Sequence, residues 1–207
     1  MINLKRYIQQ WGKGLFFTLL LMIACPLSAQ TFTGDKNLYE AYLKEDMSVW
    51  KHFVDSASAC NGLTPDLLSY EYGYCAFLVD RDKEAAKPYV KRFKQRVEDL
   101  RQVLPLGHYE MWMSAVLVFE LRLHESIRPV KAMSLAKEAT KLAPEDPLVL
   151  TYYGTSLFYA PKPFGSKQEA LEWFTKAEPY FRAPQYEFCW LREANDMYIK
   201  QCKQKLH

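Results

Sequence analysis

Apolar residues recur at steps of three and four along most of the chain from residue 36 onward, a spacing that predicts amphipathic helices. Met47, Trp50 and Val54 begin one such face, and residues 109–125 are so apolar that they predict a central, buried helix. Turn residues arrive about every 15 to 20 positions, and strand patterns are weak. The pattern therefore predicts an all-α protein built from consecutive helices.

Helix-start signals locate several of these helices. Thr64 is a typical N-cap residue, and Pro65 after it is typical of the first turn of a helix. Ser166 is followed three residues later by Glu169, a spacing that makes a capping box. Asp146 precedes an apolar run in the same way. We therefore expect helices to begin at about residues 65, 147 and 167.

Small residues recur at helical spacing in two places. The second copy begins 38 residues after the first, and each copy closes on a proline. The copies are Ala132, Ala136, Ala139 and Pro144, and then Ala170, Phe174, Ala177 and Pro179. Small side chains let two helices approach closely, and a second copy at a fixed distance predicts a stack of similar units.

This arrangement resembles the tetratricopeptide repeat (TPR) family of exported bacterial type, in which a helix with a large–Gly pair precedes a helix with Ala-x3-aromatic-x2-Ala and a proline. Leu150, Tyr153 and Gly154 occupy the first-helix positions between the two copies. The resemblance implies a right-handed α-solenoid of antiparallel hairpins in a single domain, residues 30–207. The hairpins are expected at 65–103, 109–143 and 146–182, with a C-terminal capping helix at 184–204. An irregular helical bundle is the alternative.

The resemblance also implies a concave groove lined by the first helix of each hairpin. The residues carried over to it are Tyr70, Tyr74, Phe77, Met113, Leu117, Glu120, Thr151, Thr155 and Tyr159. The alternative is that these side chains simply pack beneath the flanking helices. The Lys and Asn residues of the family's carboxylate clamp are missing from these positions, which disfavours a chaperone-type clamp. An aromatic, moderately polar groove suits an extended peptide, a partner helix or a small amphipathic ligand.

The first 29 residues predict a secretory signal peptide. Three basic residues accompany an apolar run of about 11 residues, 14–24, which is too short to span a bilayer. Small residues at 27–29 then offer a cleavage site. We expect an exported protein, periplasmic or outer-membrane-associated or else secreted, with no transmembrane segment in the mature chain. The alternatives are an uncleaved membrane anchor and a lipid anchor on Cys25, whose preceding residues match a lipobox poorly.

Removal of that leader changes the charge of the protein. The full chain has a formal net charge of +3, and the leader carries three basic and no acidic residues, so the mature chain is neutral. No global charge then attracts nucleic acid, and we predict no nucleic-acid partner. The basic residues between 83 and 101 are spread around one predicted helix and diluted by acidic ones, which indicates a solvated face.

Four cysteines remain in the mature chain: Cys60, Cys75, Cys189 and Cys202. Cys189 and Cys202 are 13 residues apart on one predicted helix, hence about 20 Å apart, whereas a disulfide tolerates about 7 Å between Cα atoms. Cys60–Cys75 is the remaining pairing that we consider, and four free, buried thiols are the alternative to it.

No residue cluster carries recognisable chemistry. The histidines lack metal-site spacing, and no nucleotide-binding or nucleophile motif occurs. Asp80, Asp82 and Glu84 resemble the start of a calcium loop, but Ala85 stands at the glycine position, so helix capping explains them better. We therefore predict a protein without enzymatic activity, metal or cofactor.

The predicted function is a protein- or peptide-binding TPR scaffold in the bacterial cell envelope. A small-ligand-binding accessory protein of an envelope transporter is the first alternative, because the groove aromatics also suit a small molecule. An enzyme with an unrecognised site is the second. The sequence does not identify the partner.

Overall fold

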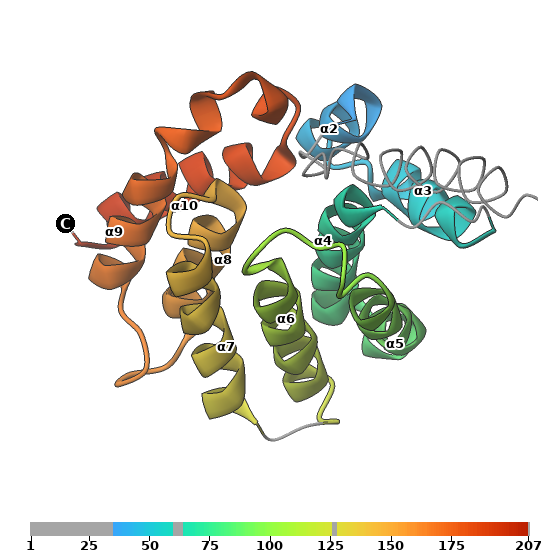
Figure 1. The fold of residues 1–207 in the computed structure, drawn as a ribbon, viewed down its shortest axis with the longest axis horizontal. Coiled ribbons are helices and arrows are strands. Elements are labelled where there is room, and N and C mark those ends of the chain that lie inside the picture. The colour runs from blue at the N-terminus through green and yellow to red at the C-terminus, as the bar shows by residue number, and fades with distance from the viewer. Residues whose placement is uncertain (1–34, 60–63, 126–127, 207) are drawn as a thin grey trace, which may run out of the picture. The chain divides into compact units, whose positions relative to one another are not determined.

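The computed structural model describes residues 35–59, 64–125 and 128–206, and every regular element in these ranges is helical (Figure 1). The all-α prediction is therefore confirmed. The helices are α2 (Lys36–Leu43), α3 (Met47–Ala59), α4 (Pro65–Arg81), α5 (Lys83–Asp99), α6 (His108–Arg122), α7 (Pro129–Leu142), α8 (Pro147–Tyr159), α9 (Lys167–Ala177), the short 3₁₀ helices η1 (Tyr180–Arg182) and η2 (Pro184–Tyr186), and α10 (Trp190–Leu206).

Several helices begin where the sequence predicted. The Ser166 side chain accepts a hydrogen bond from the backbone N–H of Glu169, as its capping box requires. Asp82 accepts from Ala85 N–H at the start of α5, so the segment that resembled a calcium loop contains a helix cap. Thr64 lies at the predicted N-cap of α4 but makes no capping hydrogen bond through its side chain.

The predicted C-terminal helix was wrong at its start. Residues 184–189 do not join one long helix: Pro184 begins the 3₁₀ turn η2, and α10 begins only at Trp190. The physical reason is local, because Tyr186 N–H bonds to Ala183 O and Cys189 N–H bonds to Tyr186 O, which are tighter i→i+3 contacts. Cys189 therefore precedes the helix that carries Cys202.

Neighbouring helices pack in pairs: α4 with α5, α6 with α7, and α8 with α9 (Figure 1). Each predicted hairpin range coincides with one of these pairs, although α6 begins one residue before the predicted range 109–143. The α3 helix packs on α4, and α10 packs on α9 and α8.

Small residues lie at the close crossings. Ala136, Ala139, Ala170 and Ala177 are completely buried. A Cβ atom added at Gly154 on α8 would lie 2.7 Å from the Phe174 ring on α9, so only glycine lets these two helices meet there. The packing role inferred for the recurring alanines is therefore confirmed.

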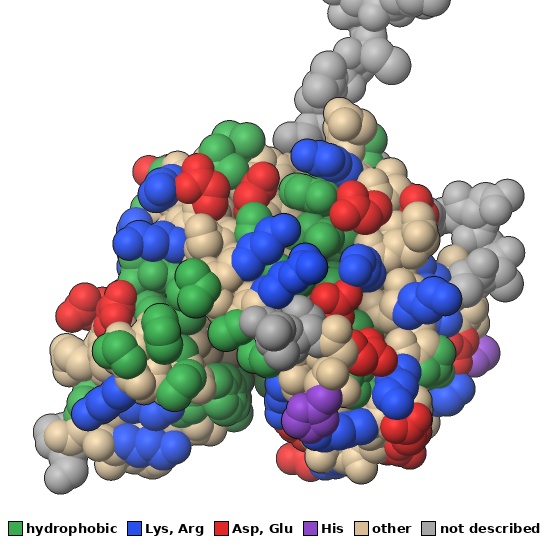
Figure 2. Space-filling model, turned by 90° about the horizontal axis from the view of Figure 1, so that it is seen from below, with side chains coloured by type: hydrophobic (Ala, Val, Ile, Leu, Met, Phe, Trp, Pro, Cys, Tyr) green, Lys and Arg blue, Asp and Glu red, His purple; other side chains and the backbone are tan. Residues whose placement is uncertain are grey.

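The basic residues of α5 are balanced by carboxylates. Lys94 pairs with Glu120 at 2.8 Å, and Lys87 pairs with Glu84 at 2.6 Å. On the face of the molecule shown in Figure 2, basic and acidic side chains are interspersed, and hydrophobic ones gather toward the C-terminal end. The expected solvated α5 helix is thus a surface of local ion pairs.

One side-chain contact joins two hairpins at a helix start. Nε2 of His108, on α6, lies 2.9 Å from Oδ2 of Asp146, and the other carboxylate oxygen of Asp146 accepts the backbone N–H groups of Leu148 and Val149. Burial alone would raise the pKa of Asp146, but the contacts with His108 and these two amides outweigh it and lower the pKa.

We predict that Asp146→Asn lowers the free energy of unfolding at pH 7 by about 1 kcal/mol, since asparagine still caps the helix but loses the charge that faces His108. The pKa of Asp146 is lower in the folded state, so its stabilising contribution is present above the unfolded value of about 3.9 and disappears as the pH falls through the folded value. Urea unfolding at pH 7 and pH 3 measures this. A stability difference of the same size at both pH values would contradict the assignment.

Candidate functional site

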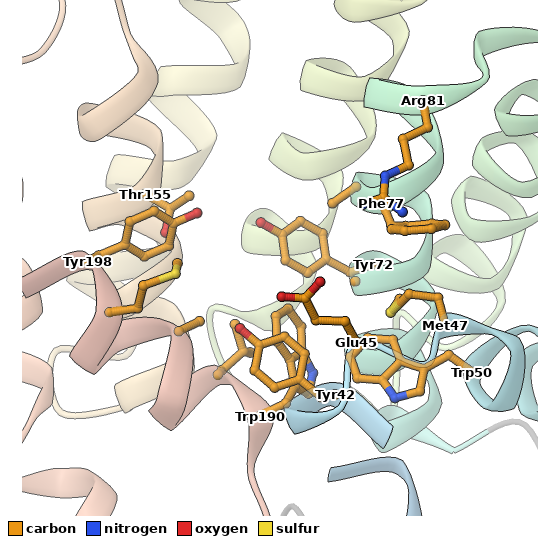
Figure 3. Close-up of a pocket in the computed structure, with 15 residues that line it drawn as sticks. Tyr42, Glu45, Met47, Trp50, Tyr72, Phe77, Arg81, Thr155, Trp190 and Tyr198 are labelled. Atoms are coloured by element: carbon orange, nitrogen blue, oxygen red, sulfur yellow. The ribbon is translucent and has the colours of Figure 1, made fainter. Parts of the chain in front are cut away.

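A cavity of about 360 Å³ lies between helices from the two ends of the described chain (Figure 3). One wall comes from α3, α4 and the end of α2, and the opposite wall comes from α8 and α10. Six aromatic side chains dominate the lining: Tyr42, Trp50, Tyr72, Phe77, Trp190 and Tyr198. This volume is at the lower end of the range for small-molecule sites in proteins, and the aromatic lining is also typical of them.

The two indole rings of the cavity are held by hydrogen bonds that face away from it. Trp50 donates from Nε1 to the carbonyl oxygen of Leu38 at 2.8 Å, and Trp190 donates from Nε1 to Oγ of Ser69 at 2.9 Å. The two rings meet edge to face with their centroids 5.3 Å apart. Because both polar N–H groups are satisfied within the protein, the two rings are held in place as an apolar part of the cavity wall.

Glycine makes room for this pair of rings. A Cβ atom added at Gly73 on α4 would lie 2.3 Å from the Trp50 ring and 3.1 Å from the Trp190 ring. The helix backbone therefore forms part of the floor on which both indoles rest. An alanine here would displace a completely buried tryptophan and reshape the cavity.

Tyr72 connects the cavity to the core. Its ring contacts Trp112, Phe119 and Tyr152, with centroids 5.4 to 5.8 Å away, and its hydroxyl group points toward the cavity (Figure 3). Burial raises the pKa of Tyr72 well above its ordinary value, so this hydroxyl stays protonated and offers a neutral hydrogen-bond donor.

Tyr198 forms the opposite wall. Its ring stacks on Phe174 with a centroid distance of 5.1 Å and an interplanar angle of 8°, and its hydroxyl lies 3.3 Å from that of Tyr159. Burial is the main cause that raises the pKa of Tyr198. Tyr159 itself is exposed, so this pair of hydroxyl groups connects the cavity lining to the protein surface.

Three of the nine residues predicted for a groove lie at or beside the cavity. Phe77 and Thr155 line it, and Tyr159 reaches it through Tyr198. Met113 is half-buried against the core, and Glu120 forms the ion pair with Lys94. These last two do not line the cavity.

The prediction of an open groove was wrong for the other four, Tyr70, Tyr74, Leu117 and Thr151, because they are buried in the core. Two of them bond to residues that are distant in the sequence. Thr151 donates a hydrogen bond to Asn195 on α10 at 3.0 Å, and the hydroxyl of Tyr70 accepts the backbone N–H of Asp35 at 2.8 Å. Part of the face that the resemblance assigned to a partner is thus covered by α10 and by Asp35, the N-cap residue of α2.

Most of the cavity aromatics were missed. Tyr42, Trp50, Trp190 and Tyr198 belong to α2, α3 and α10, outside the three predicted hairpins. The high content of aromatic residues in these flanking segments could have indicated an aromatic site, but it does not predict which rings come into contact. Their convergence follows from tertiary contacts such as the pair Tyr42–Trp190, whose centroids are 5.4 Å apart.

Side chains that bind metals are scattered. Within the part of the chain that the structure describes, no three His, Cys, Asp or Glu residues are arranged to hold a metal ion. Cys75, Cys189 and Cys202 are buried, and burial raises the pKa of Cys189 to about 12, so this thiol is protonated. Cys60, and with it the predicted Cys60–Cys75 pairing, lies outside the described residues, as do the signal peptide and Cys25.

Among the described helices, none is long and apolar enough to cross a membrane.

No protein-family model and no curated protein matches the chain. A search of solved structures finds the HusA haemophore from Porphyromonas gingivalis, with a TM-score of 0.62 and 14% sequence identity over 86% of this chain and 96% of that chain. The two chains share a fold. At this identity the likeness concerns the arrangement of the helices.

Proposed function

We propose that this chain is an exported envelope protein that binds a small, flat, amphipathic molecule in the aromatic cavity. The observation that carries the proposal is the cavity itself, with six aromatic rings around about 360 Å³ and a few polar groups at its edge. Fixed aromatic faces bind flat apolar molecules at a low entropic cost. Because the structural neighbour is a haemophore, tetrapyrroles are the ligand class to test first.

A second inference concerns the arrangement of the helices. We infer that the α4–α5, α6–α7 and α8–α9 pairs form a TPR-like right-handed solenoid and that α10 caps it. The pairing of neighbouring helices and the small residues at their crossings support this arrangement.

The peptide-binding scaffold expected from the resemblance has less support. It requires an open groove, and four of the nine residues assigned to that groove are buried. A compact cavity suits a small molecule better than an extended peptide, which needs a long edge or channel. Small-ligand binding is therefore the function that we favour.

Binding can be followed through the cavity's own tryptophans. We predict that protoporphyrin IX quenches the intrinsic fluorescence of the mature protein saturably, because Trp50 and Trp190 line the site. Ala76→Phe should weaken this binding about tenfold or more, since the half-buried Ala76 lines the cavity and a phenyl group there would fill it.

The matched control is Ala85→Phe, because Ala85 is also a partly buried alanine but does not line the cavity. It should leave the affinity unchanged. Either the absence of saturable quenching in the unaltered protein or an equal loss of affinity in both variants would refute a ligand site in this cavity.

A further inference from the structure

Two residues of opposite charge lie at the edge of the aromatic cavity: Arg81 at the end of α4 and Glu45 between α2 and α3 (Figure 3). They are the two charged residues of the described cavity lining. The lining is therefore neutral overall, but its charges are separated. A charged ligand is therefore oriented by these two groups, because each attracts the opposite charge and repels its own.

Arg81 is free to meet an acidic group. Its guanidinium carbon lies 4.1 Å above the centre of the Phe77 ring, and no ion pair engages it within the described residues. The neighbouring carboxylate of Asp80 is already paired with Arg122. Stacking on a ring orients the guanidinium plane while its N–H groups remain available, which suits two-point binding of a carboxylate.

Glu45 is held in place by an unusual backbone. Its φ of 56° lies in the left-handed region, where glycine or asparagine normally ends a helix. Two hydrogen bonds fix this conformation at the end of α2: Glu45 N–H to Tyr42 O at 3.0 Å, and Asp46 N–H to Ala41 O at 2.9 Å. The side chain of Glu45 then extends toward Tyr72, into the cavity (Figure 3).

The carboxylate of Glu45 has no ion-pair or hydrogen-bond partner within the described residues, and Glu45 lines the cavity together with Tyr42. Burial raises the pKa of Tyr42, and the negative charges of Glu193 and Glu45 raise it further. An acidic substituent placed on this side of the cavity would meet the same repulsion.

We propose that the cavity selects flat apolar acids whose carboxylates lie along one edge, because Arg81 binds that edge and Glu45 repels carboxylates on the side that it faces. This inference rests on the proposed function and adds the ligand's chemical class and orientation. Molecules with carboxylates around their whole perimeter are disfavoured, and a neutral ester of the same ring system loses the contribution of Arg81.

Three porphyrin probes separate these effects: protoporphyrin IX with two acids on one edge, its dimethyl ester with none, and coproporphyrin with four acids around the ring. Arg81→Gln should weaken the binding of protoporphyrin IX about fivefold at low salt and leave the ester unchanged, because Arg81 is exposed and an exposed ion pair contributes at most an effect of this size. Glu45→Gln should strengthen coproporphyrin by a similar factor and also leave the ester unchanged. Tryptophan quenching measures all three affinities.

Arg101→Gln is the matched control, because Arg101 also stacks on an aromatic ring, 4.5 Å above Tyr109, but does not line the cavity. It should change no affinity. The ester measures in each variant whether the cavity is intact. If the unaltered protein binds none of the probes, the proposed function fails and the inference fails with it. If it binds them but the acid-to-ester ratio is the same in Arg81→Gln, or the coproporphyrin-to-ester ratio is the same in Glu45→Gln, the inference alone is overturned.

Discussion

Glu71→Ala is expected to lower the free energy of unfolding by about 3–5 kcal/mol, the typical result of removing one partner from a buried ion pair. The Glu71 side chain is completely buried on α4. Its two carboxylate oxygens accept hydrogen bonds from Arg92 at 2.9 Å and Arg96 at 3.0 Å. Arg96 is only 5% exposed, so the variant would remove a carboxylate that faces a guanidinium charge inside the protein.

The comparison for this variant is Asp55→Ala. Asp55 also pairs with Arg92, but its side chain is 36% exposed, and the loss should be about 1 kcal/mol or less. Denaturant unfolding monitored by circular dichroism measures both variants. If Glu71→Ala is no more destabilising than Asp55→Ala, the buried network does not stabilise the fold as we describe.

Ala136→Trp is expected to destabilise the protein by about 3 kcal/mol, through overpacking of the α6–α7 crossing. The two helices are close there, because Oγ of Ser114 on α6 donates to the carbonyl oxygen of Ala132 on α7 at 2.7 Å. Ala136 lies one helical turn farther along and is completely buried. An indole ring has no room unless the helices separate.

Lys137→Trp is the control for this variant, since Lys137 is the adjacent residue on α7 and is exposed. It adds the same ring without entering the crossing and should shift stability by no more than about 0.5 kcal/mol. An Ala136→Trp protein with the melting temperature of the unaltered chain would remove the reason that we give for the alanine spacing.

The sequence predicted those features that depend on neighbours along the chain. The cap at Ser166 and the alanines of α7 and α9 were recognised because one helix or one hairpin contains the whole pattern. The start of α10 was missed because the 3₁₀ turns before it depend on i→i+3 hydrogen bonds, which helical periodicity does not distinguish from α-helix.

The cavity could not be predicted in the same way. Tyr42 and Trp190 are far apart along the chain, and their contact follows from the packing of the whole domain. The resemblance pointed to first-helix faces such as that of Thr151, and it gave no reason to expect that Asn195 would cover that face. Phe77 and Thr155 were identified because they lie where those faces reach the cavity edge.

The cavity also unites the two ends of the described domain. The hydroxyl of Tyr39 on α2 donates to Glu193 on α10 at 2.8 Å, and Trp50 on α3 touches Trp190. Terminal segments usually fray at little free-energy cost. Here the loosening of either end of the described domain opens the same cavity, so a bound molecule would hold α2 and α3 against α10. Release of the ligand and fraying of the ends would then be one event.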